Sequence, residues 1–445
     1  MSNKKIIIIG AGLSGSLLAI RLAQKGFNVA VYEKRPDMRK EKISAGRSIN
    51  LALSDRGIRG LQLIGLEKEM LSLSIPMHGR MIHNHGAEPL LLPYSGRKGE
   101  HINSISRGDL NIALLNKAET FHNIELNFDC HCIDVDIDKA EAFFEKDGNP
   151  FSVSGELVIG TDGAGSALRN SMEKNLPGFN MSLNFLDHGY KELNLPPGDN
   201  NSFLIEKNAL HIWPRKSFML IALPNLAGDF TVTLFLAHKG GQNSFEALQH
   251  KEQLHAFFQQ HFPDVQQLIP DLEEQFFTNP TGNLGTVKCF PWQANGKCLL
   301  MGDAAHAVVP FYGQGMNCSF EDVVVFDELL EQHGDHWKKV LELFEQSRKP
   351  NADAIADLAV DNFYEMRDAA GDAVFQRKRK LETMLEQNYP QYFSKYSLVT
   401  FCENVPYKQA MEQGRKQDEV LMQVCREQED VASLNLDLVL EKLNA

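Results

Sequence analysis

The chain has 445 residues, a length that corresponds to two or three domains. Hydrophobic residues make up 43% of it and charged residues 23%, which supplies ample material for a core and excludes a disordered, collagen-like or coiled-coil chain. The 45 Lys and Arg against 58 Asp and Glu give a formal net charge of −13, which argues against a general affinity for nucleic acid or anionic lipid.

The first predicted elements are a strand, a glycine turn, a helix and a second strand. Four consecutive isoleucines at 6–9 indicate a strand that is buried on both faces. Residues 16–26 predict the helix, and residues 27–35 predict the second strand. This order is typical of the βαβ unit that binds dinucleotides.

The turn itself carries the motif GxGxxG. Gly10 permits a tight turn, Gly12 lets the backbone approach a pyrophosphate, and Gly15 lets the helix pack closely on the strand. Glu33 ends the second strand, where a carboxylate can accept hydrogen bonds from an adenosine ribose. An acid there favours the free 2′-hydroxyl of FAD or NAD over the 2′-phosphate of NADP. The alternative is a glycine-rich turn beside a solvated Glu33.

Two later segments repeat the pattern of a strand that feeds a turn and a helix. The first covers 156–169, and the second covers 297–317 and is followed by a helical pattern. In the second, Gly313 and Gly315 open a helix whose backbone N–H groups could meet the ribitol, a pyrophosphate or the pyrimidine edge of a flavin.

Between these segments the chain changes character. Residues 202–290 contain alternating, β-rich runs and one charged helical stretch, which predicts an antiparallel sheet inserted into an α/β domain. After Pro350 the chain is helical and charged, with Pro390 and Pro406 as breaks. The expected units are a discontinuous FAD-binding domain (1–175 and 285–350), a substrate-binding β-sheet domain (176–284) and a C-terminal helical region that completes the substrate pocket (351–445).

The cysteines and the hydrophobic runs indicate the cellular compartment in which the protein is expected. The seven Cys are scattered, which indicates neither a disulfide framework nor a zinc cluster, so we expect reduced thiols, no metal site and a cytoplasmic protein. No run reaches the roughly 18 apolar residues of a membrane-spanning helix. The glycines after residue 9 suit a buried strand and turn better than a signal peptide.

The three glycine segments occur in a recognisable order. GxGxxG with Glu33, then Asp162 and Gly163, then Gly302 and Asp303 with Pro310, is similar to the FAD-dependent aromatic-ring monooxygenases that have a single Rossmann-like domain. Segments 46–57, 211–215, 230–236 and 396–401 resemble the branch of that family that hydroxylates L-kynurenine.

The resemblance implies a reaction and a form of the enzyme. NADPH reduces tightly but non-covalently bound FAD, O₂ adds at carbon 4a, and the resulting hydroperoxide converts L-kynurenine to 3-hydroxy-L-kynurenine in tryptophan degradation. The mitochondrial forms carry a C-terminal membrane segment, and this chain resembles the soluble bacterial type. Because no second GxGxxG follows a strand, we expect NADPH to visit a transient surface.

The resemblance also implies substrate contacts. Arg80 and Tyr94 bind the carboxylate, a task that suits the planar fork of arginine. Tyr396 is expected as a second tyrosine on the carboxylate, with Tyr407 as its rival, and Tyr312 is left open. The other residues expected at the substrate are Asn362 and Glu365 at its amino-acid end, Met366, the strand residues Leu210, Met219, Ile221, Leu223 and Phe235, and Pro310 and Phe311 on the flavin side.

At the flavin, Arg107 is expected to meet the pyrophosphate, with a helix-capping cation as the alternative. Asp303 is expected at the ribitol or at a diphosphate-bound water, and His306 in a structural role. The full set expected at the cofactor is Gly10, Gly12, Leu13, Ser14, Gly15, Glu33, Lys34, Arg107, Asp162, Gly163, Gly302, Asp303, Gly315, Met316 and Asn317. No side chain is assigned as an essential acid or base, because the aniline nitrogen already activates the ortho carbon of the ring.

Two other functions remain open at this point. One is a related FAD monooxygenase for another amino-substituted aromatic acid, and the other is a flavin-binding sensor without turnover. The expected partners are small molecules (L-kynurenine, NADPH and O₂), with no nucleic acid and no membrane segment, and a homodimer is compatible with the sequence.

Overall fold

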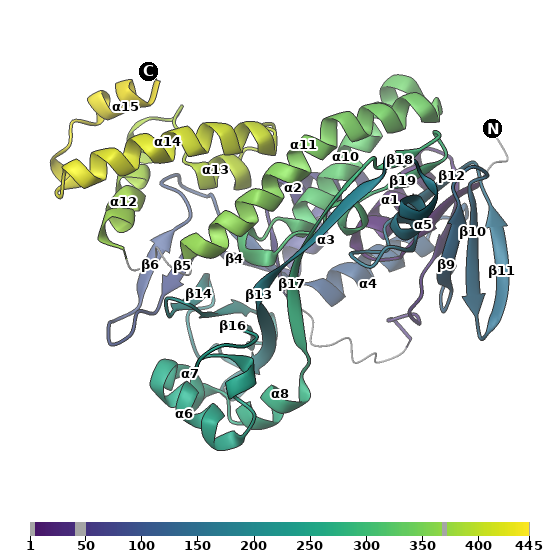
Figure 1. Ribbon diagram of the computed structural model, residues 1–445. Helices are drawn as coiled ribbons and strands as arrows, with labels where there is room; N and C mark the ends of the chain where they lie inside the picture. The colour runs from purple at the N-terminus through teal and green to yellow at the C-terminus, as the bar shows by residue number, and fades with distance from the viewer. Residues whose placement is uncertain (1–4, 41–49, 367–371, 445) are drawn as a thin grey trace.

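The computed structural model describes residues 5–40, 50–366 and 372–444 (Figure 1). Residues 46–49 of the segment 46–57 lie outside the described residues. Figure 1 shows a sheet flanked by helices, a lower lobe joined to it by long strands, and a group of C-terminal helices.

The central sheet confirms the predicted Rossmann-like unit. Its order is β18-β19-β12-β1-β2-β8, and all neighbours are parallel except β18 and β19. The strands are β1 (Lys5–Ile9), β2 (Asn28–Tyr32), β8 (Ile124–Asn127), β12 (Leu157–Gly160), β18 (Gln293–Ala294) and β19 (Cys298–Leu300). Isoleucines 6–9 are at most 3% exposed, as a strand covered on both faces requires.

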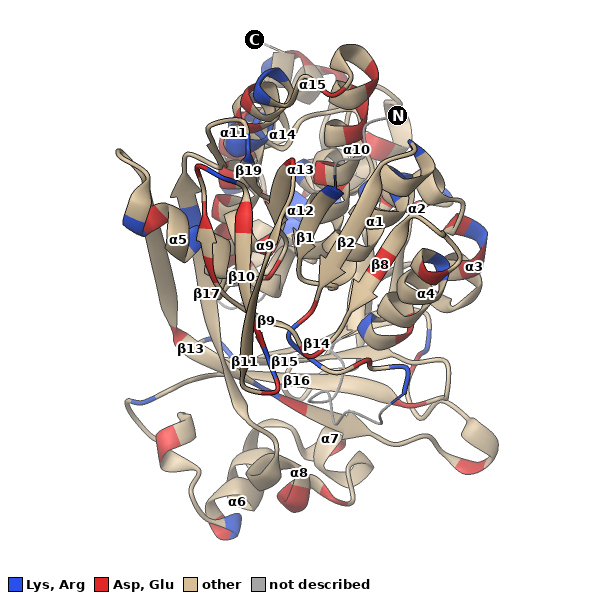
Figure 2. Ribbon diagram, turned by 90° about the vertical axis from the view of Figure 1, so that its right-hand side faces the viewer, with Lys and Arg blue, Asp and Glu red and all other residues tan. Residues whose placement is uncertain are grey.

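Helices from distant parts of the chain cover this sheet. They include α1 (Leu13–Gln24), α4 (Arg107–Glu119), α5 (Ala167–Asn175) and α10 (Gly315–His333). Helix α2 (Asp55–Ile64) packs on α10, and the short helices α3 (Glu67–Ser72) and α9 (Asp303–His306) fill connections. Figure 2 shows that Lys, Arg, Asp and Glu gather on helices and loops and leave most of the strands free of charge.

Two small sheets flank the central one. The first has the order β11-β10-β9 and consists of β9 (His131–Asp136), β10 (Glu141–Lys146) and β11 (Asn149–Ser154). The second has the order β3-β7-β4 and consists of β3 (Asn50–Leu53), β4 (Ser74–Met77) and β7 (Ile102–Ser106). The sequence patterns did not predict either of these two small sheets.

The inserted sheet has seven strands in the order β17-β13-β16-β15-β14-β5-β6. They are β5 (Gly79–Ile82), β6 (Leu90–Pro93), β13 (Asn180–Leu195), β14 (Ala209–Pro214), β15 (Met219–Pro224), β16 (Phe230–Ala237) and β17 (Thr281–Phe290). One face packs on α6 (Lys251–His261), α7 (Pro263–Leu268) and α8 (Leu272–Thr278).

The sheet differs from the expected insertion in one respect. Strands β5 and β6 extend it, and β5 pairs with β14 in parallel, so the sheet is not purely antiparallel. These two strands come from 79–93, which the expected division assigns to the FAD-binding unit. Backbone pairing thus joins part of the segment 1–175 to this sheet, and the division of the chain into units stays a prediction.

The C-terminal region is helical, as predicted. Helix α11 (Trp337–Tyr364) is followed by α12 (Ala373–Asn388), α13 (Lys395–Thr400), α14 (Tyr407–Glu427) and α15 (Leu436–Asn444). Pro390 and Pro406 lie between helices, but α11 runs through Pro350. A proline inside a helix costs about 3 kcal/mol, which the buried packing of α11 on both sides offsets.

Neither a disulfide nor a membrane helix is found in the described part of the chain. All seven Cys are free, and six of them are buried. None of the described helices combines the length and the apolar character that crossing a membrane requires.

A pair of neighbouring histidines in the seven-stranded sheet is expected to make stability depend on pH. The Nε2 of His83 lies 2.8 Å from the Nδ1 of His211, and the His83 ring stacks on Trp213 at 4.1 Å. Burial, with help from His211, lowers the pKa of His83 to about 4. Because the unfolded chain binds the proton at a higher pH, stability is present above about pH 6.5 and falls as the pH drops toward 4.

We therefore expect wild-type protein to lose up to about 3 kcal/mol of unfolding free energy through His83 between pH 6.5 and pH 4. His83→Gln should flatten this slope in urea titrations at several pH values, and His122→Gln, at an exposed position, should not. An unchanged slope in His83→Gln would show that the pair does not titrate with unfolding.

Candidate active site

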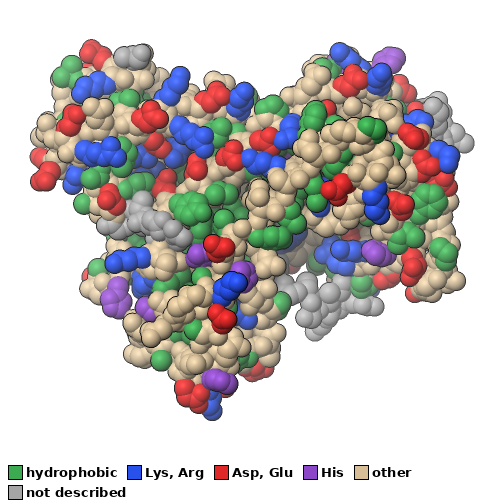
Figure 3. Space-filling view, in the orientation of Figure 1, with side chains coloured by type: hydrophobic (Ala, Val, Ile, Leu, Met, Phe, Trp, Pro, Cys, Tyr) green, Lys and Arg blue, Asp and Glu red, His purple; other side chains and the backbone are tan. Residues whose placement is uncertain are grey.

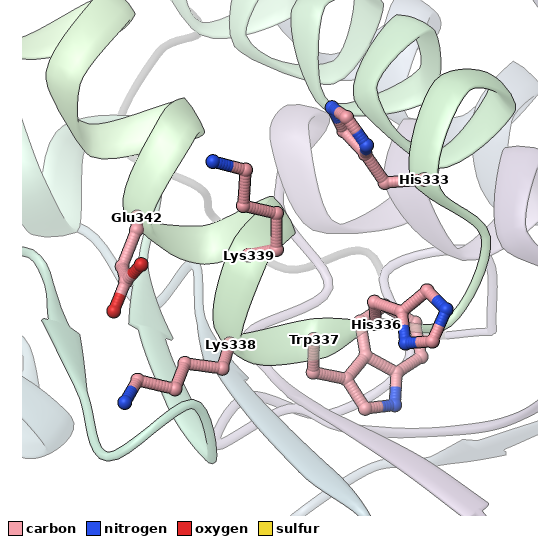
Figure 4. A pocket seen from close by; sticks show the side chains of 6 residues that line it. All are labelled: His333, His336, Trp337, Lys338, Lys339 and Glu342. Atoms are coloured by element: carbon pink, nitrogen blue, oxygen red, sulfur yellow. The ribbon is translucent and has the colours of Figure 1, made fainter.

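A cavity of about 1000 Å³ lies where the central sheet faces the seven-stranded sheet. Figure 3 shows the surface hollowed between the lobe that carries α6–α8 and the rest of the molecule. A second, shallower depression of about 520 Å³ lies at the α10–α11 junction and is lined by His333, His336, Trp337, Lys338, Lys339 and Glu342 (Figure 4). It contains no residue predicted for the site, whereas the large cavity contains most of them.

The glycine turn forms one end of the cavity. Gly10 has a φ of +100°, which favours glycine, and a side chain there would collide with the backbone of Thr161. A Cβ on Gly15 would lie 2.1 Å from the carbonyl oxygen of Gly10, so α1 can approach the turn this closely only without a side chain. A Cβ on Gly12 meets no protein atom within 4 Å, and Gly12 borders the cavity.

Glu33 supports this turn from the neighbouring strand. One carboxylate oxygen accepts a hydrogen bond from the Ala11 N–H at 2.8 Å, and the other accepts from the Arg35 Nε at 2.7 Å. Glu33 and Lys34 still border the cavity. The carboxylate therefore holds the turn and remains available to a ligand.

Unpaired polar atoms mark the place of a polar ligand. The Oγ of Ser14 and the Oδ1 of Asp162 are buried and have no hydrogen-bond partner in the part of the chain that the structure describes, and both residues border the cavity. The other carboxylate oxygen of Asp162 accepts from the Ala167 N–H at 2.7 Å, and burial raises the pKa of this group. Buried polar groups seldom stay unsatisfied, so these atoms fit the hydroxyl and phosphate groups of FAD.

Only part of the third glycine segment borders the cavity. Asp303, Gly315 and Met316 border the cavity, and so does Gly163 of the second segment. Gly302, with a φ of +60°, instead donates its N–H to an oxygen of Asp322 at 3.0 Å.

Asn317 is fully buried and does not border the cavity. Its amide nitrogen donates to the carbonyls of Ala52 and Gly313, and its oxygen accepts from the Ser54 N–H. The amide thus joins the start of α10 to the β3–α2 connection rather than reaching the cavity itself.

Arg107 borders the cavity at the start of α4 and is exposed to solvent. Nearby, burial raises the pKa of Glu192 on β13 to about 7, and Arg107 opposes this rise. The location fits a cation for an anionic ligand as well as the alternative of a helix-terminal residue.

A cluster of one arginine and three tyrosines forms the opposite end of the cavity. The guanidinium carbon of Arg80 lies 4.7 Å from the ring centre of Tyr396 and 5.7 Å from that of Tyr94. Tyr396 stacks on Tyr94 at 5.3 Å and on Tyr312 at 5.6 Å, and all four residues border the cavity.

This cluster has unused hydrogen-bonding capacity. The Nε of Arg80 and the hydroxyl of Tyr94 are buried and have no partner among the described residues. Burial raises the pKa of Tyr94, Tyr312 and Tyr396, so all three stay neutral at physiological pH. A half-buried arginine beside neutral hydroxyl donors can bind a carboxylate.

The face of the seven-stranded sheet that covers the cavity follows from strand register. Leu210, Ile221, Leu223 and Phe235 line the cavity at alternate positions. Met219 pairs with Phe235 on the same face but lies in the core beside it rather than on the lining. The flavin-side residues Pro310 and Phe311 border the cavity, and Phe311 lies 4.8 Å from the Phe235 ring.

Of the three residues expected from the end of α11, only Met366 borders the cavity. The amide nitrogen of Asn362 donates to the Phe311 carbonyl at 2.6 Å. Glu365 pairs with Lys395 at 3.4 Å, and although burial acts to raise the pKa of Glu365, Lys395 holds it below its ordinary value.

Tyr407, the rival of Tyr396, and His306, expected in a structural role, both have partners inside the protein. The hydroxyl of Tyr407 donates to Gln314 at 2.9 Å, and Tyr407 does not border the cavity, whereas Tyr396 does. His306 is buried with its Nε2 2.6 Å from Asp322. Burial acts to lower the pKa of His306, but Asp322 raises it well above its ordinary value, which suits a structural cation better than an acid or base.

Several lining residues were not singled out from the sequence. The lining also contains Arg35, Asn50, Leu51, Ala52, Tyr190, Thr231 and Thr233. Thr231 and Thr233 could have been found, because they lie four and two residues before Phe235 and therefore on its face of β16. No pattern marked the others.

Comparison with known proteins agrees with this geometry. Residues 3–359 match the family model of an FAD binding domain. The chain is 49% identical over 422 residues to a kynurenine 3-monooxygenase of Myxococcus xanthus, covering 94% of this chain and 90% of the relative. It is 44% identical to a kynurenine 3-monooxygenase of Dictyostelium discoideum, covering 98% and 96%.

Solved structures with the same fold are more distant in sequence. A tetrameric form of 2-methyl-3-hydroxypyridine-5-carboxylic acid oxygenase superposes with a TM-score of 0.66 at 21% identity, covering 89% of this chain and 96% of that one. A probable FAD-dependent monooxygenase of Pseudomonas aeruginosa, pqsL, gives 0.64 at 17%, covering 82% and 97%. The family match and the identity over nearly the full length show that this chain belongs to the kynurenine 3-monooxygenase family of FAD-binding proteins.

Proposed function

We propose that this protein hydroxylates L-kynurenine to 3-hydroxy-L-kynurenine with NADPH and O₂. The protein is an FAD-dependent monooxygenase, and its family is named for this reaction. The observation that carries the substrate assignment is that the Nε of Arg80 and the hydroxyl of Tyr94, in two residues that border the cavity, have no hydrogen-bond partner among the described residues. An amino-acid carboxylate satisfies both donors.

FAD lies along the lining in this proposal. The glycine turn and the N-terminus of α1 receive its pyrophosphate, with Arg107 as a further cation. Glu33 accepts from the ribose, and Asp162 and Asp303 meet other polar groups of the cofactor. Bound there, FAD would supply the redox chemistry that couples the oxidation of NADPH to the activation of O₂. Gly15, Gly302 and Asn317 act by shaping the turn and the helix start.

The protein's task in this reaction is to bind, orient and exclude water. Arg80, Tyr94 and Tyr396 hold the carboxylate, and the apolar face with Phe235 and Phe311 confines the ring. Asn362 acts through the Phe311 backbone that it holds. Glu365 acts through Lys395, its neighbour in the ion pair. An apolar slot keeps water from the reacting atoms, which prevents loss of the activated oxygen as H₂O₂.

Three further points belong to the proposal. NADPH visits an open surface beside the cavity rather than a second nucleotide-binding fold. The protein works in the cytoplasm, which suits its seven free cysteines. A homodimer is compatible with the sequence, and sedimentation velocity of the FAD-loaded protein tests it directly.

We expect purified, FAD-loaded protein to oxidise NADPH faster when L-kynurenine is added and to form 3-hydroxy-L-kynurenine in proportion. Oxygen consumption, NADPH absorbance and product chromatography measure the three quantities together. If another amino-substituted aromatic acid in a panel is hydroxylated and L-kynurenine is not, the substrate assignment is wrong. If bound FAD is reduced at the same rate with every compound, a sensor without turnover is the better description.

A further inference from the structure

A series of buried charged side chains begins behind the flavin-binding turn. On α10, one oxygen of Asp322 accepts from the Gly302 N–H at 3.0 Å and lies 2.6 Å from His306. Its other oxygen accepts from the Arg348 Nε at 2.7 Å. The Asp322 side chain is fully buried. Asp322 thus connects the turn before Asp303, which borders the cavity, with α11.

The series continues through the preceding residue of α10. One oxygen of Glu321 accepts from the Arg348 Nη1 at 2.5 Å, and the other accepts from the Nη1 of Arg56 on α2. The side chains of Arg56, Arg348 and Glu321 are 0%, 4% and 10% exposed. Two arginines and two carboxylates therefore share one interior site.

Arg56 uses its remaining donors on the C-terminal helices. It donates to the carbonyls of Val399 at 3.1 Å, Cys402 at 3.0 Å and Val405 at 2.5 Å. These carbonyls lie at the end of α13 and in its connection to α14, where helical carbonyls lack partners within the helix. Helix α13 carries Tyr396, so the contacts of Arg56 fix the end of the element that places this ring in the cavity.

We propose that Arg56 is a positioning residue for the substrate: by docking α13 on α10, it holds Tyr396 against Arg80. This rests on the proposed function. Replacing a buried ion pair by apolar side chains is often neutral or stabilising, so stability alone does not account for two buried arginines. The planar fork of Arg56 meets four carbonyls, that of Glu403 at 3.3 Å included, and Glu321 at once, which the single ammonium group of a lysine cannot.

The test compares Arg56→Lys with Arg59→Lys. Arg59 lies on the same helix and also pairs with a glutamate of α10, Glu328, at 2.5 Å, but both side chains are well exposed. We expect Arg56→Lys to keep FAD and to raise the KM for L-kynurenine about tenfold or more with a smaller change in kcat, because a ligand group has moved. Arg59→Lys should match wild type.

A double-mutant cycle separates an effect of Arg56 through Tyr396 from an effect on the fold as a whole. If Arg56 acts through Tyr396, the KM effect of Arg56→Lys should largely disappear in a Tyr396→Phe background. Additive effects on KM would overturn the proposal. So would an Arg56→Lys protein that fails to hold FAD, because the series would then serve the flavin turn or the fold. Glu321→Gln, a shape-preserving second variant, should raise KM in the same way, and an unchanged KM there contradicts the proposal.

Amide hydrogen exchange gives a readout that does not depend on turnover. The amides of residues 395–405 should exchange faster than wild type in Arg56→Lys and at the wild-type rate in Arg59→Lys. If wild-type protein does not hydroxylate L-kynurenine, the proposed function fails, while the exchange result still decides whether Arg56 docks α13. Equal exchange in both variants would refute the docking itself.

Discussion

Gly12→Val is expected to give a folded protein that has lost FAD. A side chain at Gly12 meets no protein atom within 4 Å, and the backbone at this position has a φ of −71°, which any residue can adopt. The added methyl groups therefore enter only the cavity, where the proposed pyrophosphate lies. Overpacking of that contact should cost roughly 3 kcal/mol or more of FAD binding, about a hundredfold or more in Kd.

The measurement is FAD absorbance per protein after gel filtration, followed by titration with FAD. Thermal unfolding of wild-type and variant apoprotein should agree closely, because the fold gains no clash. Gly15→Val is the contrast: its Cβ would lie 2.1 Å from a backbone oxygen, so this variant should be destabilised even without FAD. A Gly12→Val protein with a full complement of FAD would remove the turn from the cofactor site.

The fold was predictable where local pattern and burial agree. The isoleucines of β1 and the later segments at β12 and β19 form neighbouring strands of one sheet, and the glycine turn follows β1. They could be predicted because a strand buried on both faces has a continuous apolar run. Alternation placed Ile221, Leu223 and Phe235 on one face of their strands, and the family resemblance implied that this face covers the pocket. The place of β5 and β6 in this sheet was not predictable this way, because β5 joins it through β14, which lies far along the chain, and β6 joins it through β5.

Within the site, sequence could predict where the chain passes but not where each polar group points. Asn317 and Asn362 lie in the expected segments, but their amides are used on backbone carbonyls. Glu365 lies one turn from Asn362, and its carboxylate pairs with Lys395 from another helix. A polar side chain near a ligand can also bond to other groups of the protein. Only tertiary packing decides whether it meets the ligand or those groups.

Arg80→Ala is expected to retain FAD and to lose about 2–5 kcal/mol of interaction with L-kynurenine, about 30-fold to several thousandfold in kcat/KM. The physical reason is that a substrate carboxylate would be buried beside Tyr94 and Tyr396 without its cation. Arg80→Lys should recover only part of the loss, because an ammonium group cannot reproduce the planar fork that binds both carboxylate oxygens. Steady-state kinetics with product detection measures both variants, with FAD content as the control.

The decarboxylated analogue of L-kynurenine makes this test specific to the carboxylate. Wild-type protein should discriminate strongly against the analogue, since Arg80 and the unpaired Tyr94 hydroxyl would remain unsatisfied. In Arg80→Ala the cation that enforces this preference is gone, so the two compounds should react with similar kcat/KM. If the preference for the carboxylate survives in the variant, another group binds it and Arg80 serves only to order the tyrosine rings.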